Sequence, residues 1–313
     1  MNPPRLNRRD ALLAALTVGA GMALSRTTLA AGPGAVLTKA IPSSGQKIPV
    51  IGVGTNNYNV TDADDIAARR AVLDQLPTHG GAVVDTAPLY GRAEQVIGDL
   101  VDGLHNRDRL FLATKVMTRD ATAGEASMEE SLRRLKTQHI DLMQVHNLIG
   151  VDAMVPVLQK WKKAGRIGYF GITTSSPGQH GQLMDYMKRL PLDFIQVDYS
   201  LANRGAGDEV LPLAQQKGIA VIANSPFGGR RAAASVFGQV AGKPLPDWAA
   251  SIQITSWSQL FLKFVVSHPA ITCTVPGTTT VGHLEDNMAA AHGTLPDAAL
   301  RQKMEALWDG LKS

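Results

Sequence analysis

Three side chains that can exchange protons or carry charge each end an apolar stretch of the chain. Asp85, Lys115 and His146 end three successive stretches of this kind, and Tyr90 follows Asp85 by five residues in a loop. Each has an ordinary explanation by itself, because a carboxylate can cap a turn, a tyrosine can be half-buried and a lysine after a strand is usually solvated. Together, at the ends of neighbouring strands, the four residues indicate one chemical site.

The chemistry available to these four residues is proton transfer to an oxygen. If Lys115 is buried beside Asp85, the carboxylate keeps the ammonium group charged where burial alone would neutralise it. That cation favours the phenolate of Tyr90, whose unperturbed pKa is about 10, and so eases release of its proton. Tyr90 could then protonate a carbonyl oxygen, while His146 hydrogen-bonds the same oxygen. None of the four supplies a hydride, so a reduction needs a cofactor.

The elements that must position these residues alternate regularly. Eight short apolar runs are interpreted as strands, at residues 50–53, 82–84, 110–113, 140–145, 167–172, 194–197, 220–223 and 271–275. Helical periodicity separates them, at residues 63–76, 93–104, after a capping box at Ser127, 154–164, 178–189, 207–216, after a second capping box at Ser256, 284–291 and 297–311. This alternation predicts an α/β fold, a (β/α)8 TIM barrel.

The residues before the first strand predict a β-hairpin. Val36–Lys39 and Lys47–Val50 flank Pro42-Ser43-Ser44-Gly45, four residues that favour turns. A doubly wound sheet would instead need a glycine-rich loop followed directly by a helix. Gly52-Val53-Gly54-Thr55 lacks the third glycine and that helix, so it is interpreted as a tight turn.

Barrel active sites are built at the carboxyl ends of the strands. Besides the three charged residues, the polar or small residues at these ends are Thr55, Thr173 with Thr174, Gln196, Asn224 with Ser225, and Gly277 with Thr278. These positions are therefore candidates for binding a substrate or a cofactor.

Three segments together resemble the aldo-keto reductase superfamily. They are Val84-Asp85-Thr86-Ala87 with Tyr90-Gly91, Ser131–Leu135 leading into Ile140-Asp141-Leu142 and His146, and Ile271–Asn287 with Val275-Pro276-Gly277-Thr278. The similarity extends from about Val36 to about Ala291. It implies a (β/α)8 barrel with a hairpin across its bottom that reduces aldehydes and ketones with a nicotinamide cofactor. It also implies a catalytic tetrad, with Tyr90 as general acid, Lys115 and Asp85 tuning it, and His146 positioning the carbonyl.

The resemblance also suggests where the cofactor binds. Gln196 takes the position that contacts the nicotinamide carboxamide, and Asn287 takes an adenine-binding position. Thr173-Thr174 replaces a Ser-Asn pair, and Asn224 replaces a tyrosine that stacks on the nicotinamide ring in many relatives. The candidate cofactor contacts are thus Thr55, Thr173, Thr174, Gln196, Asn224, Ser225, Phe227, Gly228, Arg230, Thr278 and Asn287.

The form of the nicotinamide nucleotide depends on phosphate contacts. The segment at Thr278 has no arginine or lysine where many relatives hold the 2′-phosphate of NADP. Arg230 and Arg231, after the seventh strand, could bind phosphates instead, or they could be solvated surface charges. The family alone favours NADP(H) over NAD(H).

The first thirty residues are expected to be a targeting segment. Arg8-Arg9 precedes an uncharged run from Ala11 to Ser25 that is too short to span a bilayer comfortably. Small residues around Ala30 and Ala31 suit cleavage by a signal peptidase. The segment resembles a twin-arginine signal, so we expect residues 1–30 to be removed, residues 31–313 to form one barrel domain, and the protein to be exported, for example to the periplasm, by the twin-arginine machinery. An uncleaved amphipathic anchor is the alternative.

The composition argues against several other classes of function. Without residues 1–30 the formal net charge falls from +4 to about +1, which does not favour binding to nucleic acid or to a membrane surface. We expect no stable membrane span in the mature chain. Cys273 is the only cysteine, and the eight histidines show no ligand spacing, so neither a disulfide nor a zinc site is expected.

Two other activities remain open at this point. Lys115 could be the nucleophile of a Schiff-base aldolase or lyase, or the protein could be a nicotinamide-binding sensor with little turnover. In the leading interpretation the substrate is a small carbonyl compound. The loops after the first, fourth and seventh strands offer it an apolar mouth, formed by Tyr58, Leu148, Ile149, Phe227, Val236 and Phe237.

Overall fold

The computed structural model describes residues 34–228 and 236–311. The expected signal segment at residues 1–30 lies outside this range, as do Arg230 and Arg231. In the part of the chain that is described, no helix is long and apolar enough to cross a membrane.

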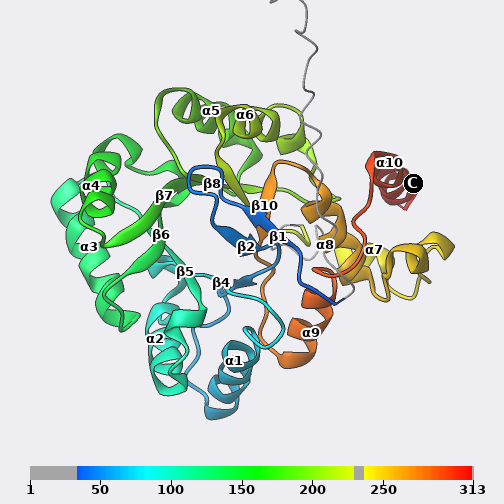
Figure 1. Ribbon diagram of the computed structural model, residues 1–313, viewed down its shortest axis with the longest axis horizontal. Coiled ribbons are helices and arrows are strands. Elements are labelled where there is room, and N and C mark those ends of the chain that lie inside the picture. The colour runs from blue at the N-terminus through cyan, green and yellow to red at the C-terminus, as the bar shows by residue number, and fades with distance from the viewer. Residues whose placement is uncertain (1–33, 229–235, 312–313) are drawn as a thin grey trace, which may run out of the picture. The chain divides into compact units, whose positions relative to one another are not determined.

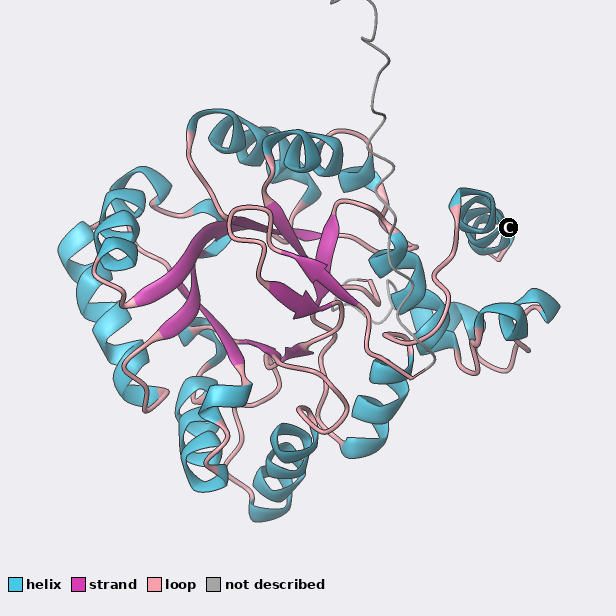
Figure 2. Ribbon diagram, in the orientation of Figure 1, coloured by secondary structure: helices cyan, strands magenta, loops and turns pink. Residues whose placement is uncertain are grey.

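Eight parallel strands form the central sheet, and each pairs with its neighbours in chain order. They are β3 (Val53–Gly54), β4 (Val83–Asp85), β5 (Phe111–Val116), β6 (Ile140–Val145), β7 (Ile167–Thr173), β8 (Phe194–Asp198), β9 (Ala220–Asn224) and β10 (Ile271–Thr274). Parallel bridges from Ile51 to Thr274 and from Gly54 to Gly277 join the first strand region to the last. The predicted (β/α)8 barrel is therefore confirmed, with its helices outside the ring of strands (Figures 1 and 2).

The main helices follow the strands, as parallel pairing requires a crossover between successive strands. They are α1 (Ala63–Gln75), α2 (Ala93–Leu104), α3 (Ala121–Arg134), α4 (Val151–Lys163), α5 (His180–Arg189), α6 (Val210–Lys217), α7 (Val236–Val240), α8 (Trp257–Ser267), α9 (Val281–Ala289) and α10 (Ala298–Gly310).

The two predicted capping boxes have different outcomes. Ser256 caps α8, because its hydroxyl accepts a hydrogen bond from the Gln259 amide at 3.1 Å. Helix α3, however, begins at Ala121, so Ser127 lies inside it. Its cap is Asp120, whose carboxylate accepts the Ala123 amide at 2.7 Å. The first turns of α3 carry small residues instead of an apolar stripe. The start of this helix therefore cannot be predicted from hydrophobic periodicity.

The N-terminal hairpin closes the amino end of the barrel. Its antiparallel strands are β1 (Thr38–Ala40) and β2 (Lys47–Pro49), which lie across the middle of the ring in Figure 1. Ile41 and Ile48 pack into the apolar cluster that fills the barrel interior. Lys39 Nζ donates to the carbonyl groups of Val266, His268 and Ile271 at 2.6–2.9 Å, and so ties the hairpin to the end of α8 and the start of β10. The open end of the barrel is thus the end where the strand carboxyl termini lie.

Candidate active site

A layer of polar side chains lies above the apolar filling of the barrel. Successive residues of a strand point to opposite faces, so every second residue points inward. The apolar cluster inside the barrel includes Val83, Ala113, Leu142, Phe194 and Ile222. Two residues after each of these, in the same order, come Asp85, Lys115, Gln144, Gln196 and Asn224. The alternation of the strands therefore aims the polar residues at the carboxyl end of the barrel interior.

Lys115 and Asp85 form a buried ion pair at the floor of this end. The Lys115 Nζ atom lies 2.9 Å from Asp85 Oδ1 and 2.8 Å from Asp85 Oδ2. It also donates to the Thr86 carbonyl oxygen at 2.8 Å. Lys115 is 1% exposed and Asp85 is 4% exposed. The ammonium group, which comes from β5, is thus held by oxygens at the end of the neighbouring strand β4.

Tyr90 lies close to the Lys115 ammonium group. Nζ of Lys115 is 5.4 Å from the centre of the Tyr90 ring. Burial by itself lowers the pKa of Lys115, but the opposing effects of Asp85 and of the Tyr90 hydroxyl outweigh burial, so this pKa lies above its usual range. This pKa keeps Lys115 a cation beside Tyr90.

His146 faces Tyr90 across the site. The two rings are edge-to-face, with centroids 6.0 Å apart and planes at 86°. Burial, and then the charge of Lys115, lowers the pKa of His146 to about 3. The imidazole is therefore neutral at ordinary pH and carries one N–H donor. A neutral donor beside a phenol suits hydrogen bonding to a carbonyl oxygen.

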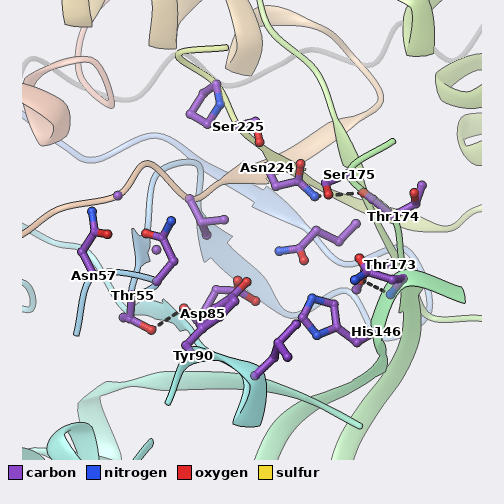
Figure 3. A pocket seen from close by; sticks show the side chains of 18 of the residues that line it. Thr55, Asn57, Asp85, Tyr90, His146, Thr173, Thr174, Ser175, Asn224 and Ser225 are labelled. Atoms are coloured by element: carbon purple, nitrogen blue, oxygen red, sulfur yellow. Dashed lines mark hydrogen bonds between the residues drawn. The ribbon is translucent and has the colours of Figure 1, made fainter. Parts of the chain in front are cut away.

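These residues open into a cavity of about 420 Å³ at the carboxyl ends of the strands. Asp85, Tyr90 and His146 line one side of it, and Thr174, Ser175, Asn224 and Ser225 lie on the opposite side (Figure 3). Of the candidate cofactor contacts, the cavity is lined by Thr55, Thr173, Thr174, Gln196, Asn224, Ser225, Phe227 and Gly228. The structure thus brings together most of the candidate residues.

The cavity also has lining residues that we did not predict. They are Gly54, Asn56, Asn57, Leu89, Asn147, Ser175, Pro226 and Val275. Gly277, one of the predicted strand-end candidates, lines the cavity as well. Most of the unpredicted residues lie beside a predicted strand end, so extending each strand-end candidate by two residues would have found them. Leu89 is 58% exposed and gives the mouth of the cavity an apolar residue next to Tyr90.

Among the candidate cofactor residues that the structure describes, Thr278 and Asn287 do not line the cavity. Asn287 Nδ2 donates to the Thr278 hydroxyl at 3.1 Å, and both residues are buried. The Thr278 carbonyl oxygen accepts the hydroxyl of Tyr58 at 3.1 Å.

The prediction of an apolar cavity mouth is only partly right. Tyr58 is fully buried and Leu148 is 5% exposed, and neither lines the cavity. Phe227 does line it, and the ring of Phe237 packs against Phe227 with centroids 5.0 Å apart. The Tyr58 hydroxyl donates to a buried carbonyl group, and this allows the whole side chain to be buried. The sequence does not show such a contact, because its two residues are far apart along the chain.

Comparisons with known proteins agree with this geometry. The family model described as "Aldo/keto reductase family" matches residues 50–307. The chain is 30% identical over 273 residues to methylglyoxal reductase YeaE of Escherichia coli, covering 84% of this chain and 92% of that protein.

Solved structures show the same likeness. An aldo/keto reductase from Klebsiella pneumoniae in complex with NADP and acetate is 27% identical, with a TM-score of 0.70 over 87% of this chain and 96% of the other. The holo form of an aldo-keto reductase from Bacillus halodurans, 24% identical, shares the fold with a TM-score of 0.72, over 87% of this chain and 96% of the other. This protein belongs to the aldo/keto reductase family and is an enzyme of that family.

Proposed function

We propose that this enzyme reduces aldehydes or ketones by hydride transfer from a nicotinamide nucleotide, with Tyr90 as the proton donor. The observation that carries the proposal is the placement of Lys115, which is buried, paired with Asp85 and next to the Tyr90 ring at the cavity wall. Lys115 stabilises the tyrosinate that forms when Tyr90 gives its proton to the substrate oxygen. Neutral His146 donates a hydrogen bond to the same oxygen and fixes its direction.

The cavity fits a nicotinamide group by its polar atoms. Gln196 Nε2 and Asn224 Oδ1 are buried and have no hydrogen-bond partner in the protein, and both residues line the cavity. When bound, a reduced nicotinamide supplies the hydride that the side chains cannot supply. We assign NADPH as the preferred form, because two Klebsiella pneumoniae aldo/keto reductase structures similar to this chain hold NADP or NADPH. Asn287 and Arg230 stay in this proposal as contacts for the more distant parts of the nucleotide.

The aldolase alternative needs a free amine at Lys115. Lys115 Nζ instead donates to Asp85 and to the Thr86 carbonyl, and its pKa lies above its usual range, so the amine is held protonated. A protonated amine cannot attack a carbonyl carbon. Borohydride treatment in the presence of aldehydes should therefore trap no adduct on Lys115, and a trapped adduct would favour the aldolase.

The proposed activity is tested by turnover. Purified enzyme should oxidise NADPH in the presence of small aldehydes, and a panel can begin with methylglyoxal because of the name of the Escherichia coli relative. Nucleotide binding without reduction across aldehydes, ketones and quinones would favour the sensor alternative.

We also propose that the protein is exported by the twin-arginine machinery and acts outside the cytoplasm. Support comes from Arg8-Arg9, the short uncharged run from Ala11 and the small residues around Ala30 and Ala31. Because that machinery carries folded proteins, the nucleotide could bind before export.

A further inference from the structure

Asn224 lines the cavity and carries a buried acceptor that has no partner in the protein. It ends β9, and its Nδ2 atom donates to the Thr174 carbonyl oxygen at 3.0 Å, as Figure 3 shows. This bond fixes the orientation of the amide, because the reversed amide would place two oxygens against each other. Asn224 Oδ1 is thereby turned away from Thr174, and it is buried without a partner.

A second unpartnered atom lies on the neighbouring strand. Gln196, on β8, is 2% exposed, lines the same cavity and has no partner for its Nε2 donor. Gln196 pairs in register with Ile222 on β9, and Asn224 comes two residues after Ile222. Because every second residue of a strand points to the same face, the side chains of Gln196 and Asn224 both point into the barrel from adjacent strands. Gln144 also has an amide without a partner, but it does not line the cavity.

Unpartnered buried polar atoms are costly, and a ligand that pairs with them removes this cost. The ligand here must accept a hydrogen bond from Gln196 and donate one to Asn224. A carboxylate or a ketone can only accept, and a carboxylate would be repelled by Asn224 Oδ1. A primary carboxamide does both, since it carries a carbonyl oxygen and an NH2 group.

We propose that Asn224 Oδ1 accepts a hydrogen bond from the carboxamide NH2 of the nicotinamide, while Gln196 Nε2 donates to the carboxamide oxygen. Asn224 thus recognises the nucleotide through a hydrogen bond, at a position where the resemblance leads one to expect a stacked aromatic ring. This assignment rests on the proposed function, because it takes the nicotinamide nucleotide as the ligand.

The test compares NADP⁺ with its 3-acetylpyridine analogue, in which a methyl group replaces the NH2 and the carbonyl oxygen is kept. Calorimetry of the full-length protein gives a Kd for each nucleotide. The wild type should bind NADP⁺ more tightly by on the order of tenfold, because the analogue leaves Asn224 Oδ1 unpaired. Equal affinities in the wild type would overturn the assignment.

Two variants separate the two hydrogen bonds. Asn224→Ala should weaken NADP⁺ binding by on the order of tenfold and leave the analogue almost unchanged, so that the ratio of the two Kd values approaches one. Gln196→Met, the matched control, should weaken both nucleotides equally and keep the ratio, because both keep the carbonyl oxygen. If Asn224→Ala kept the wild-type ratio of the two Kd values, the assignment would also be overturned.

The outcomes for this assignment and for the proposed function are distinct. Circular dichroism shows whether each variant is folded, and the wild-type ratio stands as a test even if Asn224→Ala does not fold. If the wild type bound neither nucleotide, the proposed function itself would fail. If it bound both with equal affinity, only the role of Asn224 would fail.

Discussion

The ammonium group of Lys115 contacts both carboxylate oxygens of Asp85, at 2.8 and 2.9 Å, with almost no solvent at either side chain. Such a pair is costly to break, because removal of one partner leaves a buried charge alone. The Lys115 ammonium group of this pair also lies 5.4 Å from the centre of the Tyr90 ring. The ion pair therefore matters both for the stability of the barrel and for the acidity of Tyr90, and these two effects can be separated.

Lys115→Met should lower the free energy of unfolding by about 3–5 kcal/mol and abolish measurable reduction, because Asp85 is left unpaired and Tyr90 loses its cation. Denaturant titration and kcat measure the two effects. The double variant Lys115→Met with Asp85→Asn should recover most of the stability and none of the activity. Recovery of activity in the double variant would contradict a role for the Lys115 charge in catalysis.

His146 should remain neutral across the working pH range. Its pKa is about 3 in the folded protein, against about 6.5 in the unfolded chain. The unfolded chain therefore takes up a proton first as the pH falls, so this group's contribution to stability is lost between pH 6.5 and 3. Histidine NMR should show an imidazole of His146 that does not titrate near pH 6.5. His146→Gln should unfold with a weaker pH dependence in this window than the wild type, and an equal dependence would contradict the assignment.

Lys39 provides a comparison at the closed end of the barrel. Its ammonium group lies among three carbonyl oxygens, and burial, followed by the charge of Arg301, lowers its pKa to about 8. Because the folded protein releases this proton before the unfolded chain does, the Lys39 contribution to stability should rise with pH between 8 and 10.5. Lys39→Met should abolish that rise in urea titrations and leave kcat unchanged, since the hairpin closes the end of the barrel away from the cavity. A large loss of kcat would show that the two ends are coupled.

Arg8→Lys combined with Arg9→Lys should retain the protein in the cytoplasm with its first thirty residues attached. The twin-arginine interpretation depends on this pair, and lysine keeps the charge while changing the side chain. Cell fractionation and the intact mass of the protein check the result. A mature form beginning near residue 31 or 32 outside the cytoplasm, in spite of the double substitution, would rule out this route.

The sequence allowed the strand ends to be located, and with them Asp85, Lys115 and His146, because apolar runs end visibly at a polar residue. It also predicted the barrel and the hairpin, since both depend on periodicity and turn residues. It did not reveal that Tyr58 is buried against the Thr278 carbonyl group, or that α3 begins at Ala121. The burial of Tyr58 depends on a contact between residues that are distant in the sequence. The start of α3 is marked only by its cap, because the first turns of this helix carry no apolar stripe.

The details of the cavity wall were also beyond the sequence. Asn224 was recognised as a departure from the family pattern, but the direction of its amide is set by the Thr174 carbonyl group, fifty residues earlier. Asn56 and Asn57 line the cavity directly after the predicted strand-end residue Thr55, so they are missed only because the candidates stop at the first polar residue of each strand end.

The most direct test of the central claim is a single turnover by Tyr90→Phe loaded with NADPH. The phenyl ring keeps the packing against His146 and removes only the proton donor. We expect NADPH to bind as it does to the wild type, and the oxidation of bound NADPH by an aldehyde to slow by about 10²–10⁴-fold. Oxidation at the wild-type rate with NADPH fully bound would contradict the role of Tyr90 as the proton donor.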